Sequence, residues 1–172
     1  RERGWNDHTP QSATRFAVEG LLQGDRPIGL WHFAGHGDFN PEAPGQSPFL
    51  LEDDRRLYPQ EIQGAMQAHL YRDRPLVFMN ACRTGSSGLS VSGMGGWAAV
   101  MVGHCNCGAF VAPLWSVDDQ MACELGKQFY ERLMAGDTLG EAMWAARDHV
   151  RQLAPSNPTW LAYSLYGHPN TI

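Results

Sequence analysis

Lysine is nearly absent from this chain of 172 residues, in which Lys127 is the only one. Acidic side chains outnumber basic ones by 18 to 13, which gives a formal net charge of −5, and no basic run exceeds Arg55-Arg56. Proteins that bind nucleic acid concentrate Lys and Arg on one face or along one helix. The composition therefore argues against nucleic acid as a direct partner.

Long hydrophobic runs are also missing. No stretch approaches the roughly 20 apolar residues that span a bilayer, and the amino terminus lacks the charged and then apolar pattern of a secretory signal. The four cysteines are too few and too irregularly spaced for a secreted disulfide scaffold. We therefore expect no membrane partner, reduced thiols and a soluble, cytoplasmic protein.

The length is that of one domain, and we predict a single domain over residues 1–172. The sequence begins at Arg1 and opens directly on a helix signal, with Thr9 as the cap and Pro10 in the first turn. We therefore expect this domain to be a portion of a longer protein.

Strand and helix patterns alternate along the chain. Strands are predicted at about 28–34, 49–52, 75–81, 108–114 and 160–166. Helices are predicted after Pro10, over 59–70 and 97–103, from Asp118 or Asp119 to Gly136, and from the capping box Thr138-Leu139-Gly140-Glu141 onward. This alternation predicts an α/β fold with a mostly parallel sheet and helices on both faces. Such sheets place their functional sites beyond the carboxyl ends of the strands.

Two of the predicted strands end at chemically reactive residues. The first strand leads to His36 between two glycines, and the strand that begins near Pro75 ends at Cys82. A thiol and an imidazole at the ends of neighbouring parallel strands are the components of a cysteine nucleophile with its base. His32 has the same strand parity as His36 but lies deeper, so we expect it to form a hydrogen-bonded wall of the site. His8, His69, His149 and His168 have no partner motif and are predicted to lie at the surface.

Two alternative chemistries are weaker. The cluster His104-Cys105-Asn106-Cys107 has zinc-binding residue types but lacks a second pair of ligands, so we predict that Cys105 and Cys107 are packed core thiols and that no metal is bound. The Gly/Ser-rich stretch 85–96 lacks the Gly-Lys-Ser/Thr of a phosphate-binding loop. We interpret it as a mobile loop that gates the substrate.

Several blocks of the sequence resemble, in order, the blocks of the CHAT domain, a protease family related to caspases and separases. The blocks are His32-Phe33-Ala34-Gly35-His36-Gly37, Asn80-Ala81-Cys82-Arg83-Thr84-Gly85, Leu114-Trp115-Ser116-Val117-Asp118-Asp119, Phe129-Tyr130 and Leu165-Tyr166-Gly167-His168-Pro169. The resemblance extends from about residue 10 to 169. It implies a caspase-like three-layer sandwich that hydrolyses peptide bonds without a metal or an organic cofactor. The usual first strand, helix and second strand of that family are not visible in this sequence, and a sheet without them would have a long unpaired edge.

The resemblance also implies roles for particular residues. His36 would be the catalytic base, Cys82 the nucleophile, and the backbone N–H groups of Gly37 and Cys82 the oxyanion donors. A glycine beside the base lets the backbone approach a tetrahedral oxyanion closely, and a thiol is acidic enough to be activated by histidine alone.

The resemblance also implies that substrate is recognised by the block that follows the strand predicted at 108–114 and by the strand of the nucleophile. One of Asp118 and Asp119 is expected to cap a helix, and the other is expected to face the specificity pocket. Trp115 is also expected to bind the substrate. Relatives that cut after arginine often carry an acid two residues before the cysteine, whereas this chain has the neutral Asn80. A preference for Arg or Lys is thus only slightly favoured.

Family members are typically fused or bound to sensor or repeat modules and cut a protein partner when a signal arrives, often in prokaryotic defence. We therefore expect a cysteine endopeptidase with a protein substrate and a sensor module, fused or bound. The alternative is a catalytically silent, caspase-like interaction module within a larger sensor complex.

Overall fold

The computed structural model describes residues 6–38, 40, 43, 46–82 and 95–171, with Cys82 described by its backbone. Its six described strands are β1 (Leu30–Gly37), β2 (Phe49–Leu50), β3 (Arg56–Leu57), β4 (Leu76–Cys82), β5 (Ala109–Pro113) and β6 (Tyr163–Gly167). The α-helices are α1 (Arg15–Gln23), α2 (Ala65–Asp73), α3 (Gly95–Ala98), α4 (Asp119–Ala135), α5 (Leu139–Leu153) and α6 (Thr159–Ala162). A 3₁₀ turn, η2 (Pro59–Glu61), precedes α2, and a π-helical turn, η3 (Ala99–His104), extends α3.

The strands form one mixed sheet in the order β3-β2-β1-β4-β5-β6. β1, β4 and β5 are parallel neighbours, whereas β2 is antiparallel to β1, β3 to β2, and β6 to β5. Four of the six described strands, β1, β3, β4 and β5, therefore run in one direction. The predicted α/β class and the mostly parallel sheet are confirmed.

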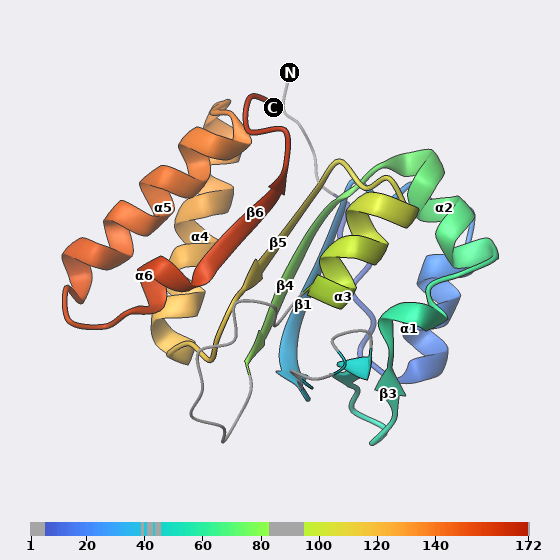
Figure 1. Ribbon diagram of the computed structural model, residues 1–172. Helices are drawn as coiled ribbons and strands as arrows, with labels where there is room; N and C mark the ends of the chain where they lie inside the picture. The colour runs from blue at the N-terminus through green and yellow to red at the C-terminus, as the bar shows by residue number, and fades with distance from the viewer. Residues whose placement is uncertain (1–5, 39, 41–42, 44–45, 83–94, 172) are drawn as a thin grey trace.

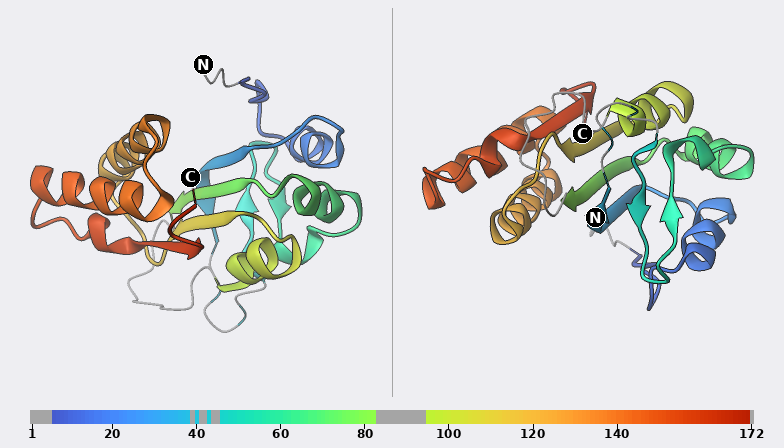
Figure 2. Two further views of the ribbon diagram at one scale, coloured as in Figure 1. Left: turned by 90° about the horizontal axis from the view of Figure 1, so that it is seen from above. Right: turned by 60° about the horizontal axis from the view of Figure 1, so that its bottom comes forward.

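Helices cover the two faces of this sheet, as predicted (Figures 1 and 2). On one face, α1, α2 and α3 pack their apolar side chains against β1, β4 and β5 around Phe33, Val77 and Met79. On the other face, α4 and α5 enclose a second core around Phe78, Val111 and Phe129. The alternation of Val77 and Phe78 between the two cores is the side-chain alternation of a strand that is buried on both faces.

Local signals place the ends of the two long helices. The Asp118 carboxylate accepts a hydrogen bond from the Met121 N–H at 2.9 Å and caps α4, which ends at Gly136 in the left-handed region (φ 100°). Thr138 and Glu141 form the predicted capping box of α5. These helix boundaries are confirmed.

Other boundaries and elements were predicted wrongly. The first helix is capped by Thr14, because Thr9 instead bonds to the carboxylate of Asp7. The first part of the strand predicted at 160–166 is a helical turn, α6, which begins at Thr159 and ends at Ala162. The Thr159 N–H donates to the Asn157 side chain just before this turn. The short strand β3 was not predicted.

One edge of β1 is open in the described part of the chain. β1 is in register with β4 from Leu30 to His36, but β2 reaches only His36 and Gly37 on the other side. The described residues therefore provide no strand partner for the far edge of residues 30–35. Within the described ranges, no helix has both the length and the apolar character needed to cross a membrane.

Candidate active site

His36 and Cys82 are direct register partners at the carboxyl ends of the parallel strands β1 and β4. Neighbouring strands lie about 4.8 Å apart, so the two backbones are as close as a sheet allows. Each residue stands at or next to the last position of its strand, and His36 is exposed. The predicted neighbouring strands are confirmed, although His36 belongs to the strand itself, since β1 continues to Gly37.

The end of β1 is held in place by an aromatic stack on the opposite face of the sheet. Phe33 stacks on Phe49 at a centroid distance of 4.6 Å, and Phe49 stacks on Trp97 at 4.1 Å. The Trp97 indole N–H also donates to the Ser47 carbonyl at 2.8 Å. This stack holds β2 against the last two residues of β1, His36 and Gly37.

Positions 36 and 82 lie on the face of the sheet that α4 and α5 cover. Alternation along β4 places Phe78 in the core of that face, so Asn80 and position 82 follow on the same side. On β1 the corresponding positions are His32, Ala34 and His36, all of them exposed. The site therefore has a rim of positions 36 and 82 above a layer of Ala34 and Asn80.

His32 lies one layer deeper, as a hydrogen-bonded wall. Its ring stacks on Phe78 at 5.1 Å, and its Nδ1 is 2.6 Å from the Tyr130 hydroxyl. Although the residue as a whole is exposed, the contacts with these rings desolvate the imidazole, and this burial lowers the pKa of His32. Burial also raises the pKa of Tyr130, so its hydroxyl stays neutral. The predicted hydrogen bonding of His32 is confirmed, and its place in the wall of the site stays a prediction.

Asn80 is fixed by a residue that sequence reasoning did not single out. The Tyr163 hydroxyl donates to Asn80 Oδ1 at 2.7 Å, and Tyr163 is fully buried. An Arg147 guanidinium N–H in turn donates to the Tyr163 carbonyl. Buried tyrosines need a partner for the hydroxyl, which is the one signal that could have pointed to Tyr163, but its partner is 83 residues away in sequence.

The Gly37 N–H is directed toward β4. The Asp38 N–H donates to the Pro48 carbonyl at 3.0 Å. In an antiparallel pair the hydrogen-bonded positions alternate, so Gly37, which is opposite Phe49, is at a non-hydrogen-bonded position. Its N–H therefore points away from β2. The N–H points instead to the side of β1 on which β1 forms hydrogen bonds with β4. Use of this N–H by a substrate oxygen therefore requires the last rung of the ladder, at His36 and Cys82, to open.

The acidic block lies at the same end of the sheet. Asp118 is the cap of α4, while Asp119 occupies the first turn, and both are exposed. Trp115 is half-buried against the core between the sheet and α4. In the described part of the chain, no hydrogen bond or ion pair joins these three residues to His36 or Asn80. The predicted gating stretch lies outside the described residues except at its end, because 83–94 are not described.

Cys105 and Cys107 are core thiols. Both are buried, and the burial raises the pKa of Cys105 to about 11 and of Cys107 to about 12. Thiols with such pKa values are poor nucleophiles and poor metal ligands at neutral pH. Among the described residues, no group of three or more His, Cys, Asp or Glu side chains could hold a metal ion. The predicted packing of these two cysteines is confirmed.

His69 was predicted to lie at the surface, and this prediction is wrong. The residue is 4% exposed, with Nδ1 at 3.0 Å from the Leu22 carbonyl and Nε2 at 2.9 Å from the Arg26 carbonyl. Asp73 Oδ2 lies 3.0 Å from the same Nε2. His69 follows Met66 by three positions and so shares the buried face of α2, a periodicity that could have revealed its burial.

Comparison with protein families matches the CHAT domain over residues 6–168, nearly the whole chain. The chain belongs to the CHAT domain family. It is thus a caspase-like, protease-type domain, as the sequence blocks indicated. A search of curated proteins finds no match. In this CHAT domain the described geometry brings the His36 position to the Cys82 position and joins Asn80 to Tyr163 by a hydrogen bond.

Proposed function

We propose that this CHAT domain is a cysteine endopeptidase with His36 and Cys82 as its catalytic dyad. The observation that supports the proposal is the register of β1 and β4, in which these two residues are direct partners at the carboxyl ends of parallel strands. Both positions share one face of the sheet, and the exposed His36 is accessible to a substrate.

The chemistry follows from the two residue types. The Cys82 sulfur attacks the carbonyl carbon of the scissile peptide bond while His36 accepts the thiol proton, and the oxyanion is stabilised by the N–H groups of Gly37 and Cys82. When the tetrahedral intermediate collapses, the C–N bond breaks and His36 returns the proton to the leaving amine. Water, deprotonated by His36, then hydrolyses the thioester and restores the thiol.

The proposal also covers the substrate, the location and the activation of the domain. The substrate is a protein, and Asn80, Trp115, Asp118 and Asp119 line the region that receives it. The domain acts as one unit over residues 1–172 in the cytoplasm, needs no cofactor, and is switched on by a sensor module in prokaryotic defence. These features agree with a protease-type domain whose described helices include no candidate membrane span.

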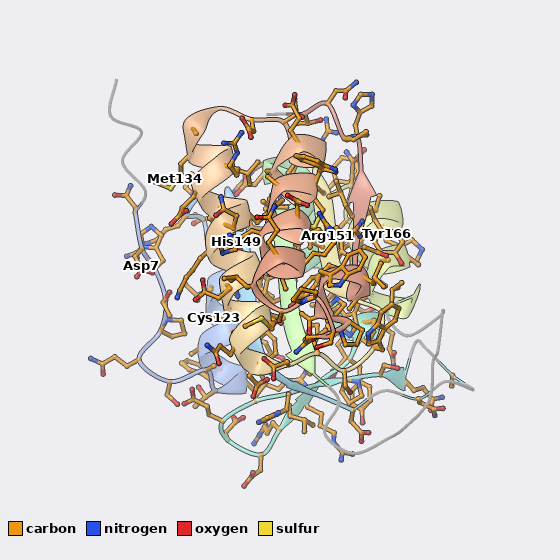
Figure 3. All side chains as sticks on the ribbon, turned by 90° about the vertical axis from the view of Figure 1, so that its left-hand side faces the viewer. Asp7, Cys123, Met134, His149, Arg151 and Tyr166 are labelled. Carbon is orange, nitrogen blue, oxygen red and sulfur yellow. The ribbon has the colours of Figure 1, made fainter. Side chains whose placement is uncertain are left out.

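The test is cleavage by the full-length parent protein. The parent is incubated with candidate activators and with proteins encoded beside it, and new fragments are detected by mass spectrometry. Cys82→Ala and His36→Ala should each abolish the cleavage. Cys123→Ala is the matched control, because Cys123 is exposed on the outer surface of α4 (Figure 3) and should leave the cleavage unchanged.

A different result would decide against the proposal. If the Cys82→Ala variant cleaves as well as the parent protein does, the assignment of Cys82 as the nucleophile is wrong. If the parent binds its activator and partner proteins but produces no fragment under any condition, the domain is the silent interaction module.

A further inference from the structure

β6 is the last strand of the sheet, and no described strand pairs with its outer edge. The Leu114 N–H donates to the Ala162 carbonyl just before β6, so the even-numbered residues of β6 are the ones that form hydrogen bonds with β5. Leu165 and Gly167 are therefore at non-hydrogen-bonded positions, and their N–H and C=O groups point away from β5. In the described part of the chain, this edge is open to a further strand.

One side of α5 lies beside this edge. α5 runs back along β6 (Figure 1), because the Gly140 N–H donates to the Pro169 carbonyl just past the end of β6, and Arg147 donates to the Tyr163 carbonyl at its start. Trp144 follows Gly140 by four positions and precedes Arg147 by three, so it lies on the same side of the helix, level with the middle of β6. Its side chain is 71% exposed. An exposed indole beside an open strand edge provides an apolar contact for an added strand.

The guanidinium of Arg147 is a cation without a carboxylate partner among the described residues. Its Nε is buried and has no hydrogen-bond partner. Burial lowers the pKa of Arg147, with no neighbouring carboxylate to offset the loss of water. A half-buried guanidinium gains most from a carboxylate, which accepts two parallel N–H bonds. This part of the surface therefore favours an acidic partner.

The charges of the surface disfavour a second copy of this chain. β6 and residues 168–172 contain no acidic side chain. The acids on the outer side of α5, Asp148 and Glu141, already accept hydrogen bonds from a neighbouring side chain or from the helix cap. Two copies paired through β6 would bring Arg147 of each copy to the shared edge without a carboxylate between them. An acidic segment of another protein supplies the missing carboxylate.

We propose that the outer edge of β6 and the side of α5 with Trp144 and Arg147 bind an extended segment of a partner protein, in which an apolar residue is followed two positions later by an acidic one. The segment pairs antiparallel with Leu165 and Gly167. Leu165 packs into the core under α4 and α5, so a residue opposite it faces α5. Side chains two positions apart on a strand lie about 6.8 Å apart on one face, which lets the apolar residue pack on Trp144 and the carboxylate bind Arg147. Antiparallel pairing fixes the order, because the segment passes Trp144 before it reaches Arg147.

The first experiment measures peptide binding to the full-length parent protein with Cys82→Ala, so that no peptide is cut. The probe is the fluorescently labelled peptide Thr-Val-Thr-Leu-Thr-Glu-Thr-Val, and binding is followed by fluorescence anisotropy. Glutamine in place of glutamate should lower the affinity about tenfold or more, the effect of one charge-assisted pair. Exchange of leucine and glutamate should also weaken binding. Equal affinities for the glutamate and glutamine peptides, or no binding of the glutamate peptide at millimolar concentration, overturns the proposal.

Variants of α5 test the two contacts. Arg147→Met should bind the glutamate and glutamine peptides equally, whereas Arg147→Lys keeps the charge and should keep a preference for glutamate. Trp144→Ala should weaken binding several-fold and should no longer distinguish leucine from serine at the apolar position. Met134→Ala is the matched control, because Met134 is exposed on α4, away from β6 (Figure 3), and should leave binding unchanged. A preference for glutamate that persists in Arg147→Met, or unchanged binding by Trp144→Ala, shows that the peptide binds elsewhere.

Peptide N-methylation tests the strand pairing itself. In the proposed pairing the N–H groups of leucine and glutamate point to β6, and the N–H of the threonine between them points away. Methylation of the leucine nitrogen should therefore abolish binding, and methylation of that threonine nitrogen should leave the affinity within a few-fold. Equal effects of the two methyl groups contradict an added strand. Sedimentation of the parent protein without peptide tests the other occupant, since a dimer that Trp144→Ala dissociates would assign this edge to a second copy and overturn the proposed partner.

Discussion

Asp73 links the helix α2 to the start of the strand that carries His36. Its carboxylate accepts from the Ile28 N–H at 2.8 Å, contacts His69 Nε2 at 3.0 Å, and accepts from the Arg72 guanidinium at 2.7 Å. These hydrogen bonds, with Arg72 as the largest cause, lower the pKa of Asp73 from 3.8 to about 2. We predict that Asp73→Asn destabilises the fold at neutral pH.

The magnitude follows from that shift. A difference of about 1.8 pKa units corresponds to about 2.4 kcal/mol of unfolding free energy, which we reduce to about 1–2 kcal/mol because Arg72 is half exposed and screened by solvent. A lowered pKa of a carboxyl group stabilises the folded state above the unfolded value, here 3.8, and this contribution is lost as the pH falls through about 2. For a domain of this size the loss at pH 7 lowers the melting temperature by about 2–8 °C.

The assay is urea unfolding of the parent-derived domain and its Asp73→Asn variant at pH 7 and at several lower pH values. The two unfolding free energies should differ by about 1–2 kcal/mol at pH 7 and converge toward pH 2. Arg72→Ala removes only the half-exposed part of this network and should cost less than Asp73→Asn, at most about 1 kcal/mol. Equal stability of Asp73→Asn and the wild type at pH 7, or a difference that does not shrink on acidification, would refute the reasoning.

Three further predictions concern the site itself. Because burial lowers the pKa of His32 below 6.5, the unfolded chain binds the proton more readily, so the unfolding free energy should fall as the pH drops below 6.5, and His32→Phe should flatten this dependence in pH-resolved urea unfolding. Gly37→Ala keeps the N–H, and its Cβ would meet Ala81 Cβ at an ordinary 3.4 Å, so cleavage should stay within a few-fold of wild type. Gly37→Pro removes the donor and should cost about a hundredfold or more in cleavage rate; a wild-type rate in a folded Gly37→Pro protein would exclude the oxyanion role.

Elements with strong local signals were predictable from the sequence. The cap Asp118, the stop at Gly136 and the capping box at Thr138 involve hydrogen bonds between residues three to five positions apart, so the pattern contains all the partners. The same reasoning failed at Thr9, because a second candidate cap, Thr14, lies five residues further on and Asp7 competes for the first. Where two local signals compete, tertiary packing decides between them.

The register of His36 with Cys82 was partly predictable, because the carboxyl ends of neighbouring parallel strands meet at one edge of the sheet. The partner of Asn80 was not. Tyr163 reaches Asn80 only because β6 follows the turn α6 and pairs antiparallel with β5, which moves residue 163 to the carboxyl end of the central strands. No periodicity in the sequence encodes a contact between residues so far apart.

The most direct test of the account is the reactivity of Cys82 with and without His36. The activated full-length protein is treated with iodoacetamide between pH 5 and 9, and the alkylation rate of each cysteine is followed by peptide mass spectrometry. Cys82 should react faster than the exposed Cys123 at pH 6–7, and His36→Asn should reduce the rate at Cys82 to that of Cys123 without changing Cys123 itself. If His36→Asn leaves the Cys82 rate and its pH dependence unchanged, His36 does not activate Cys82 and the proposed dyad is wrong.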